Sequence, residues 1–483
     1  MKNASAAIHK TPPDVFSLLP KYWEDCDRDE NLIKLTHVCH DWRKLFTSRP
    51  SLWTRLNCRS VEKTKVYIER SKPFLLEISL KLTHNTPHRE EALVTTIPHF
   101  CRLGTLSLYG NSAQVLPALV KYFSTPAPLL HTLNISISRG EPILPEMFLN
   151  RNLSSLRELS LGGIVTPLPW RGLSDLTTFN LRRVPGDRIH LSRLLSFLES
   201  ASRLQYVRLH TSIPNSCDGS AEWVVSLPHL KELSFITKQP HSTLLNHLSI
   251  PTGALLRLEY TFSGLESPIP SYLPNLPNNL NNLSHITAMN LCFGSEQRSL
   301  RLSGPSGELY MFGHWTRADH KPNAGVGKFL YSLDPFDVSR TRWLAVTLCI
   351  YRPGDQVSME TWSLYKALRS MEDLRTLTLA QSNSYHFILI LNPNETNIVL
   401  CRKLEEIVVY IERPDQLRIK ELLSMAEERA SRGAKLSAIT IISTTALAPT
   451  TEVTFQLRKH VSRVECKFDD APPAWDTLPV TRA

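Results

Sequence analysis

Three residues of this sequence have side chains and a spacing that could bind a metal ion: His37, Cys39 and His40. Imidazole nitrogen and thiolate sulfur are ligands that zinc prefers, and the three positions fit within about one turn of a helix. Cys39, however, also falls on a stripe of apolar residues, and no further ligand residues cluster near it in the sequence. We therefore predict a cysteine that packs in a core and no metal site.

A second segment, residues 323–329 (Asn-Ala-Gly-Val-Gly-Lys-Phe), has part of the spacing of a phosphate-binding loop. Such a loop needs a glycine five residues before its last glycine and a Ser or Thr after its lysine. Here those positions are Pro322 and Phe329. No Gly-x-Ser-x-Gly nucleophile elbow occurs, and Asp469 and Asp470 are expected to be solvated. The sequence thus predicts a protein without catalytic residues or a cofactor.

The composition of the 483 residues is that of a globular protein with a basic surface. The net charge is +10, but no run of five basic residues occurs, so we expect no nucleic-acid partner. The nine cysteines include no Cys-x-x-Cys pair, which predicts neither a zinc module nor a disulfide framework. No apolar stretch approaches the ~20 residues of a spanning helix, and residues 1–14 lack the apolar region of a signal peptide. We expect a soluble protein of the cytoplasm or nucleus with no membrane partner.

A short apolar template repeats along most of the chain. Templates with apolar residues at offsets 0, 3 and 5 begin at positions 75, 103, 130, 156, 176, 204, 230, 255, 286, 343, 374, 404, 436 and 461. Neighbouring starts lie 20–32 residues apart, except for one interval of 57 residues after position 286. This is the period of leucine-rich repeats, in which each repeat contributes one strand. The spacing therefore predicts a repeat protein.

Helical patterns separate the expected strands, at residues 89–100, 114–123, 192–200, 359–371 and 416–433. The last pattern ends at Gly433, a residue type typical of the position after a helix. Strands that alternate with helices favour a parallel sheet with the helices on its outside. The predicted fold class is α/β, with a curved leucine-rich-repeat-like solenoid over residues 58–294 and 336–468.

The 57-residue interval contains a different pattern. Residues 298–312 alternate around a Gly-Pro-Ser-Gly turn, which predicts an antiparallel β-hairpin. A polar segment, residues 312–329, follows it. We expect residues 295–335 to form a hairpin and loop insertion that interrupts the solenoid.

Residues at offsets 2, 4 and 6 of each template should face the concave side of the sheet. Most are Ser, Thr and Asn, which fits an ordinary polar strand face. Because Tyr and Arg dominate the energetics of protein interfaces, the alternative is a surface that binds a target protein. Its candidate residues are Tyr109, Arg182, Tyr206, Arg208, His210 and Arg257.

The first 57 residues differ from the repeats. Pro12 suits the first turn of a short helix that Pro20 should end. A second helix would carry one continuous apolar stripe made of Leu32, Leu35, Cys39 and Trp42. A segment of this size buries little apolar surface. We therefore expect apolar residues outside the stripe to stay exposed and to mark a binding surface. The alternative is that the segment only caps the first repeat.

Residues 11–57 resemble an F-box. The family pattern starts with a Pro–acidic–hydrophobic motif, which Pro12, Asp14 and Val15 match. It ends with Val-Cys-x-x-Trp and Leu-Trp motifs, which residues 38–42 and 52–53 match. Thr11 and Pro20 depart from the pattern. The following residues resemble the degenerate leucine-rich repeats of F-box proteins from mushroom-forming fungi.

The resemblance implies a substrate-recognition subunit of an SCF-type ubiquitin ligase. The F-box would bind a Skp-type adaptor through Pro12, Pro13, Val15, Phe16, Leu19, Leu32, Leu35, Val38, Cys39, Trp42, Leu52 and Trp53. The repeats would hold a target protein whose identity the sequence does not give, and the chain would not itself be an enzyme. The alternative is a leucine-rich-repeat scaffold without ligase association. Residues 1–10 and 469–483 are expected to be disordered.

Overall fold

The computed structural model describes residues 28–82, 87–140, 142–144, 148–151, 153–165, 173–183, 190–210, 223–237, 242–262, 279–293, 297–315, 336–348, 361–380, 384–411, 419–443 and 451–468. The chain divides into two compact units, unit 1 (Met1–Val184) and unit 2 (Pro185–Ala483). The two expected disordered ends, the first expected helix and the loop-like segment 323–329 lie outside the described residues.

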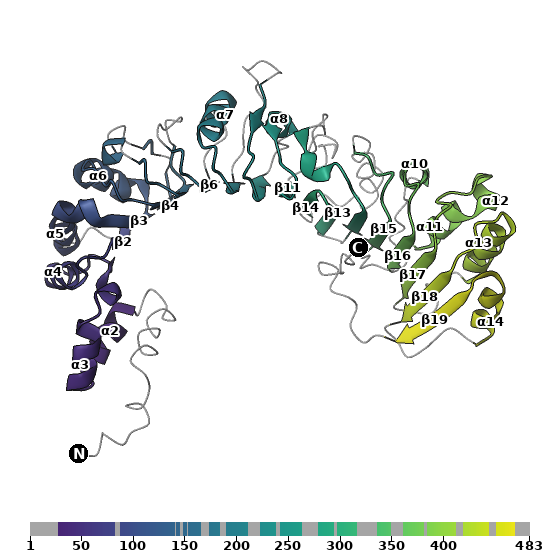
Figure 1. The fold of residues 1–483 in the computed structure, drawn as a ribbon, viewed down its shortest axis with the longest axis horizontal. Coiled ribbons are helices and arrows are strands. Elements are labelled where there is room, and N and C mark those ends of the chain that lie inside the picture. The colour runs from purple at the N-terminus through teal and green to yellow at the C-terminus, as the bar shows by residue number, and fades with distance from the viewer. Residues whose placement is uncertain are drawn as a thin grey trace. The chain divides into compact units, whose positions relative to one another are not determined.

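Unit 1 alternates helices with short strands. Its elements in chain order are α2 (Arg28–Thr36), α3 (His40–Thr47), the 3-10 helix η3 (Pro50–Trp53), β1 (Arg55–Leu56), α4 (Val61–Arg70), β2 (Leu76–Leu82), α5 (Pro87–Thr96), η4 (Ile97–Arg102), β3 (Leu103–Gly110), α6 (Ser112–Tyr122), β4 (Thr132–Ile137), η5 (Phe148–Arg151), β5 (Glu158–Gly162) and β6 (Thr178–Arg182). Helices α4, α5 and α6 lie along one face of the strands (Figure 1).

The strands of unit 1 pair in parallel and in chain order, from β1 to β6. The pairing aligns two rows of buried apolar side chains: Leu106, Leu133, Leu159 and Phe179 in one, and Leu108, Ile135, Leu161 and Leu181 in the next. These are the template positions, so the predicted phase is confirmed for β3 to β6. At β2 a register shift after Leu76 buries that residue and leaves the expected Leu75 exposed.

Unit 2 is longer and begins with a helix. Its elements are α7 (Leu191–Ser200), β7 (Tyr206–His210), β8 (Val225–Ser226), β9 (Glu232–Thr237), α8 (Ser242–Asn246), β10 (Leu248–Ser249), β11 (Leu255–Phe262), η9 (Asn281–Leu283), β12 (Ala288–Phe293), β13 (Gln297–Gly304), β14 (Gly307–Trp315), β15 (Trp343–Leu348), α10 (Thr361–Ser370), β16 (Thr376–Ala380), α11 (Ser384–Leu391), α12 (Pro393–Thr396), β17 (Glu406–Ile411), α13 (Ile419–Ser431), β18 (Ala438–Ser443), α14 (Thr451–His460) and β19 (Arg463–Phe468).

The predicted hairpin is confirmed, and it is part of the main sheet. Strands β13 and β14 pair antiparallel across the Gly304–Gly307 turn. β14 also pairs in parallel with β11, and β13 pairs antiparallel with β12, which in turn lies parallel to β15. The order is therefore β7-β9-β11-β14-β13-β12-β15-β16-β17-β18-β19. The antiparallel β13 thus interrupts the succession of parallel strands, while both hairpin strands remain paired within the same sheet.

Two templates of unit 2 are displaced by two residues from their predicted starts. In β11 the register pairs Leu256 with Leu233, so Leu256 is buried and Leu255 is not. In β15 Leu344 pairs with Leu377, so Leu344 is buried where Trp343 was expected. A shift of two residues keeps every side chain on its predicted face.

The five predicted helices are confirmed as α5 with η4, α6, α7, α10 and α13. Gly433, with φ of 76°, follows the last of them and accommodates the left-handed conformation that ends it. The chain is a mixed α/β protein, with a mainly parallel sheet and twelve α-helices in the residues that the structure describes. None of the helices in this part of the chain is long and apolar enough to cross a membrane.

Candidate functional site

The helices that precede the sheet of unit 1 are arranged differently from the sequence expectation. The single helix predicted to carry the stripe from Leu32 to Trp42 is wrong, because α2 ends at Thr36 and α3 begins at His40. Arg43 Nε donates to the Thr36 carbonyl oxygen at 3.0 Å, which satisfies the end of α2. Cys39 is extended, with φ of −158°. The break places Val38 in the turn between the two helices.

Trp53 connects this segment to the first repeat. Its indole Nε1 donates to the carbonyl oxygen of Phe46 in α3 at 2.9 Å. Its ring meets the Tyr67 ring of α4 edge to face, with 4.9 Å between the centroids. The guanidinium carbon of Arg70 lies 4.4 Å from the same ring centroid, a cation–π contact. Trp53 therefore packs α3 against α4.

The predicted adaptor-binding residues fall into three groups. Pro12, Pro13, Val15, Phe16 and Leu19 lie outside the described residues. Leu32, Trp42, Leu52 and Trp53 are buried by this chain itself. Leu35 and Cys39 are half-buried, and Val38 is 58% exposed. The surface that the described part of this segment offers to another protein is therefore centred on Val38.

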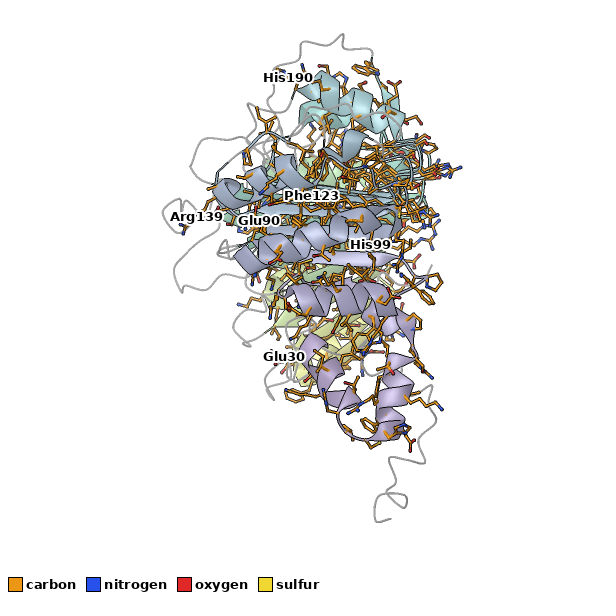
Figure 2. The ribbon with its side chains drawn as sticks, turned by 90° about the vertical axis from the view of Figure 1, so that its left-hand side faces the viewer. Glu30, Glu90, His99, Phe123, Arg139 and His190 are labelled. Carbon is orange, nitrogen blue, oxygen red and sulfur yellow. The ribbon has the colours of Figure 1, made fainter. Side chains whose placement is uncertain are left out.

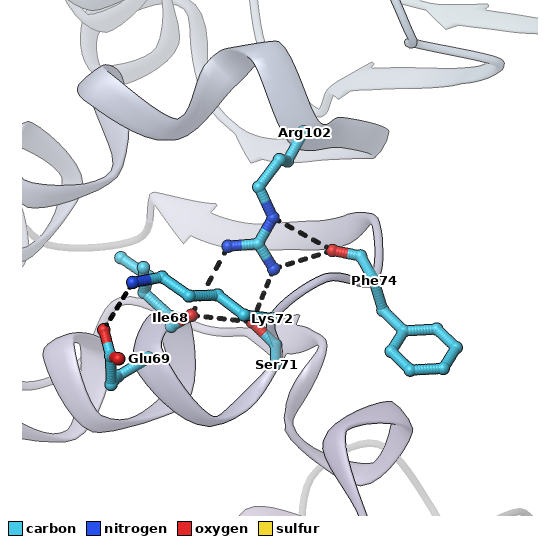
Figure 3. A network of polar contacts seen from close by, with 6 residues as sticks. All are labelled: Ile68, Glu69, Ser71, Lys72, Phe74 and Arg102. Atoms are coloured by element: carbon cyan, nitrogen blue, oxygen red, sulfur yellow. Dashed lines mark hydrogen bonds and ion pairs between the residues drawn. The ribbon is translucent and has the colours of Figure 1, made fainter.

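The turn that joins α4 to β2 is fixed by Arg102, which ends η4 (Figure 3). Its Nε and Nη2 donate to the Phe74 carbonyl oxygen at 3.1 and 2.7 Å, and Nη2 also donates to Ser71 Oγ at 3.0 Å. Beside them Lys72 Nζ lies 2.8 Å from Glu69 Oε2, and this bonding lowers the pKa of the Glu69 carboxyl. The network holds the first helix of the repeat at a fixed position relative to its strand.

Neighbouring helices of unit 1 are joined through Glu90, which is labelled in Figure 2. Its carboxylate accepts hydrogen bonds from Lys121 and Tyr122 of α6, and these bonds lower the pKa of the Glu90 carboxyl. The pKa of His99, labelled in the same view, is lowered by partial burial and then by the charge of Arg102. Both pKa changes result from packing and hydrogen bonding between neighbouring parts of unit 1.

The polar face of the unit 1 sheet carries small side chains between two larger ones. Tyr109 of β3 and Arg182 of β6 are exposed and lie in one register row, separated by Ser136 and Gly162. Three strand spacings of about 4.8 Å put them roughly 14 Å apart. The structure therefore does not bring these two predicted residues into contact, but leaves a shallow polar surface between them.

The polar face of the unit 2 sheet is richer in charge. Tyr206, Arg208 and His210 are exposed on β7, as predicted. Arg208 Nη2 lies 3.2 Å from Glu232 Oε1, and Lys231 Nζ lies 5.9 Å from the centroid of the Tyr206 ring. Of the predicted target-binding residues, Arg182 belongs to unit 1, and Tyr206, Arg208 and His210 belong to unit 2.

Arg257 of β11 is exposed and lies next to the hairpin. The register places it beside Tyr310 of β14, which is beside Arg301 of β13. The Arg257 guanidinium carbon is 5.6 Å from the Tyr310 ring centroid, and Tyr310 stacks on Phe312 at 6.2 Å. Arg301 Nη2 lies 3.0 Å from Glu308 Oε2. The hairpin thus adds basic and aromatic groups to the face that carries Arg257.

We call these neighbouring side chains the Arg257 face. It comprises Tyr206, Arg208, His210, Arg257, Arg301, Tyr310 and Phe312. The sequence reasoning missed the last three, which come from the hairpin. Their alternation puts them on one side of the hairpin, but only the pairing of β14 with β11 places that side next to Arg257.

Two buried thiols have strongly shifted acidities. Burial raises the pKa of Cys58 to about 12, and it does the same for Cys401. A thiol with such a pKa is a poor nucleophile near neutral pH. In the described ranges no group of three or more His, Cys, Asp or Glu side chains is arranged to hold a metal ion.

No protein-family model matches this chain, and no curated protein matches it either.

Proposed function

We propose that this chain is the substrate-recognition subunit of an SCF-type ubiquitin ligase. The helical segment before the sheet would bind a Skp-type adaptor, and the strand–helix repeats, as a leucine-rich-repeat-like solenoid, would hold a target protein. The chain contributes proximity rather than catalysis, because it raises the local concentration of a target lysine near the charged ubiquitin-conjugating enzyme.

The observation that carries the adaptor half of the proposal is the exposure of Val38. This residue belongs to the Val-Cys-x-x-Trp motif and is 58% exposed in the turn between α2 and α3. The tryptophans of the segment are buried, and Arg43 bridges that turn by donating to the Thr36 carbonyl oxygen at 3.0 Å. An exposed apolar residue on a rigid support is the kind of group that a partner protein covers.

The target half of the proposal rests on the Arg257 face. Arginines over aromatic rings supply flat contact area together with directed hydrogen bonds, and such groups concentrate binding energy. Arg257 stands over Tyr310, while Arg208 and Arg301 pair with glutamates of the same face. A target with an acidic or carbonyl-rich segment would satisfy Arg257 without breaking these pairs.

The adaptor interaction is tested by titrating the full chain with a purified Skp-type adaptor in a calorimeter. We expect a complex, and we expect Val38→Asp to weaken it by about tenfold or more. The matched control is Val120→Asp on α6, because Val120 is 61% exposed and lies outside the segment. If the unchanged chain forms no complex, or if Val38→Asp binds as well as Val120→Asp, the proposal is overturned.

A second candidate is a leucine-rich-repeat scaffold that does not join a ligase. The burial of Leu32, Trp42, Leu52 and Trp53 favours it, because a segment that packs its large apolar residues inward also serves as a cap for the first repeat. The calorimetric titration separates the two: the scaffold gives no heat of binding with the adaptor.

The target surface is tested by crosslinking in cells with the ligase stalled. Arg257→Glu should remove the crosslinked proteins that the unchanged chain captures. Lys420→Glu makes the same change of charge on an exposed residue of α13 and should retain them. Loss of the same proteins from both variants would rule out a specific role for the Arg257 face.

A further inference from the structure

The sheet of unit 2 ends, in the described residues, at β19, and the apolar side of this strand is uncovered. Cys466 continues a register row whose other members, Ile441, Val409, Leu379 and Val346, are all buried. Cys466 itself is exposed. In the next row Phe468 is 56% exposed, whereas Ser443 and Ile411 are buried. Only the last strand thus presents these core positions to solvent.

The cause is the placement of the helices. Each helix from α10 to α14 lies on one face of the unit 2 strands (Figure 1), so an interior strand is covered by the helix before it and the helix after it. Helix α14 precedes β19, and within the described residues, which end at Phe468, no helix follows it. A terminal repeat needs a cover of this kind.

The uncovered side forms an open hollow of about 720 Å³ between α14 and β19. Phe455, Val464 and Cys466 line it together with the polar residues Glu452, Thr454, Gln456 and Arg458. Phe455 is 63% exposed, the highest value among the large apolar residues that the structure describes. The charges of Glu452 and Arg458 balance, so the apolar lining of Phe455, Val464 and Cys466 is what a ligand would cover, and it suits an apolar ligand group.

We propose that the terminal segment of this chain, residues 469–483, folds back into this hollow, with Trp475 between Phe455 and Cys466. The segment begins where β19 ends, and its fifteen residues span up to about 50 Å when extended, more than twice the roughly 20 Å of the six-residue strand. It carries Trp475, Leu478 and Val480 as apolar groups.

The charges of the two parts are complementary. The segment contains Asp469, Asp470, Asp476 and Arg482, a net charge of −2, and the last turn of α14 contains Arg458 and Lys459. Attraction between these opposite charges would stabilise the docked segment most at low ionic strength, where salt screens it least. The apolar side chains supply most of the binding free energy, since burying an indole removes about 150–250 Å² of surface from water.

A second copy of the chain is a poorer occupant of the same edge. The outward face of β19 carries Arg463, Glu465 and Lys467, which pair with one another at 3.4 and 2.8 Å. In a symmetric antiparallel pair of β19 strands centred on Glu465, each residue would face a like charge, because Arg463 would oppose Lys467 of the other copy. Like charges directly opposite one another destabilise strand pairing.

The prolines of the segment give it a second effect. Pro472, Pro473 and Pro479 lack the N–H group that strand pairing requires. A segment with these residues covers the apolar side of β19 but does not extend the sheet. It therefore does not itself become a new edge strand with which other chains could pair.

The experiment measures the alkylation of Cys466 by N-ethylmaleimide in the native full chain, with peptide mass spectrometry as the readout. Cys101 is also exposed but lies in unit 1, so it serves as the internal reference. We expect alkylation of Cys466, relative to Cys101, to rise about tenfold in a chain that ends at Phe468 and in Trp475→Ala, because the docked segment opens only transiently. Trp475→Phe should restore most of the protection.

Equal rates for Cys466 in the full chain, the shortened chain and Trp475→Ala would overturn the proposal. A rate that falls as the protein concentration rises would also overturn it, since a second copy would then be the occupant. Both outcomes leave adaptor binding untouched, so this proposal and the proposed function stand or fall separately.

Discussion

The indole nitrogen of Trp53 donates a hydrogen bond to the carbonyl oxygen of Phe46 at 2.9 Å, inside the chain's own core. Both side chains are fully buried, so this bond is shielded from water and its loss leaves a buried carbonyl oxygen without that donor. A tryptophan that the sequence motif assigns to the adaptor is thus used to join α3 to the repeat behind it. The proposed adaptor surface around Val38 would depend on this packing, although Trp53 is not part of that surface.

Replacing Trp53 therefore tests the internal role directly. Trp53→Phe keeps an aromatic ring but removes the hydrogen bond, and should lower the free energy of unfolding by about 1–3 kcal/mol. Trp53→Ala also leaves a cavity and should cost about 3–5 kcal/mol. Urea unfolding followed by circular dichroism measures both. Val38→Ala is the control and should stay within about 0.5 kcal/mol, because Val38 is exposed. A neutral Trp53→Phe variant would contradict the packing described.

The buried guanidinium of Arg429 is a second structural anchor. Its Nη1 donates to the Leu400 carbonyl oxygen at 2.8 Å and its Nη2 to the Cys401 carbonyl oxygen at 2.9 Å, which fixes α13 against the turn before β17. Burial lowers the pKa of this guanidinium, yet the two carbonyls stabilise its charged form.

Arg429→Ala should destabilise unit 2 by about 3–5 kcal/mol, because it leaves a cavity and two unsatisfied carbonyls. Arg432→Ala is the matched control in the turn after the same helix. Arg432 is exposed and lies 3.9 Å from Glu428. It donates long hydrogen bonds to Asn394 Oδ1 at 3.3 Å and to the Asn397 carbonyl oxygen at 3.5 Å. Its loss should therefore change the free energy of unfolding by no more than about 1 kcal/mol. Hydrogen exchange of the peptides over residues 400–431 reports the effect locally. Equal protection in the two variants would show that Arg429 is not an anchor.

The repeat could be predicted from the sequence because its signal is periodic. Leu106, Leu133 and Leu159 recur at a spacing that only stacked strands satisfy, and the structure aligns them in one row. The predicted template starts in β11 and β15 lie two residues too late, because Leu255 and Trp343 also fit the apolar template. Side chains of a strand alternate between its two faces, so a template start displaced by two residues still places every side chain on the same face. The sequence pattern alone therefore does not distinguish the two starts.

Other features depended on contacts that the sequence does not encode locally. The spacing from Leu32 to Trp42 fits one continuous helix, and the break at residues 37–39 is set by Arg43 bonding back to the Thr36 carbonyl oxygen. Likewise Tyr310 joins Arg257 only because β14 pairs with β11, a choice between alternative partner strands. The sequence therefore indicated which residues share a strand face but not which strands meet.

Two glycines with similar backbone angles should respond differently to alanine. Gly163 and Gly433 have φ of 65° and 76°, a conformation that costs a non-glycine residue about 1–2 kcal/mol. A Cβ on Gly433 would meet open space, whereas a Cβ on Gly163 would lie 2.2 Å from the Ile137 carbonyl oxygen. We expect Gly433→Ala to cost about 1–2 kcal/mol and Gly163→Ala about 1–3 kcal/mol more. Thermal unfolding of the two variants measures the difference, and equal melting temperatures would contradict the close approach of β4 to Gly163.

The buried thiol of Cys58 should make stability depend on pH in the alkaline range. Its pKa is about 12 in the folded chain and near 9 when solvated, so between these values the unfolded state binds fewer protons than the folded state. The contribution is fully present below pH 9 and is lost as the pH rises toward 12, at about 1.4 kcal/mol per pH unit for one thiol. Urea unfolding at pH 8, 9 and 10 should therefore show a steeper fall for the unchanged chain than for Cys58→Ala. Cys101→Ala removes an exposed thiol and should leave the slope unchanged. Parallel curves for the unchanged chain and Cys58→Ala would mean that the Cys58 thiol ionises as readily in the folded protein as in water.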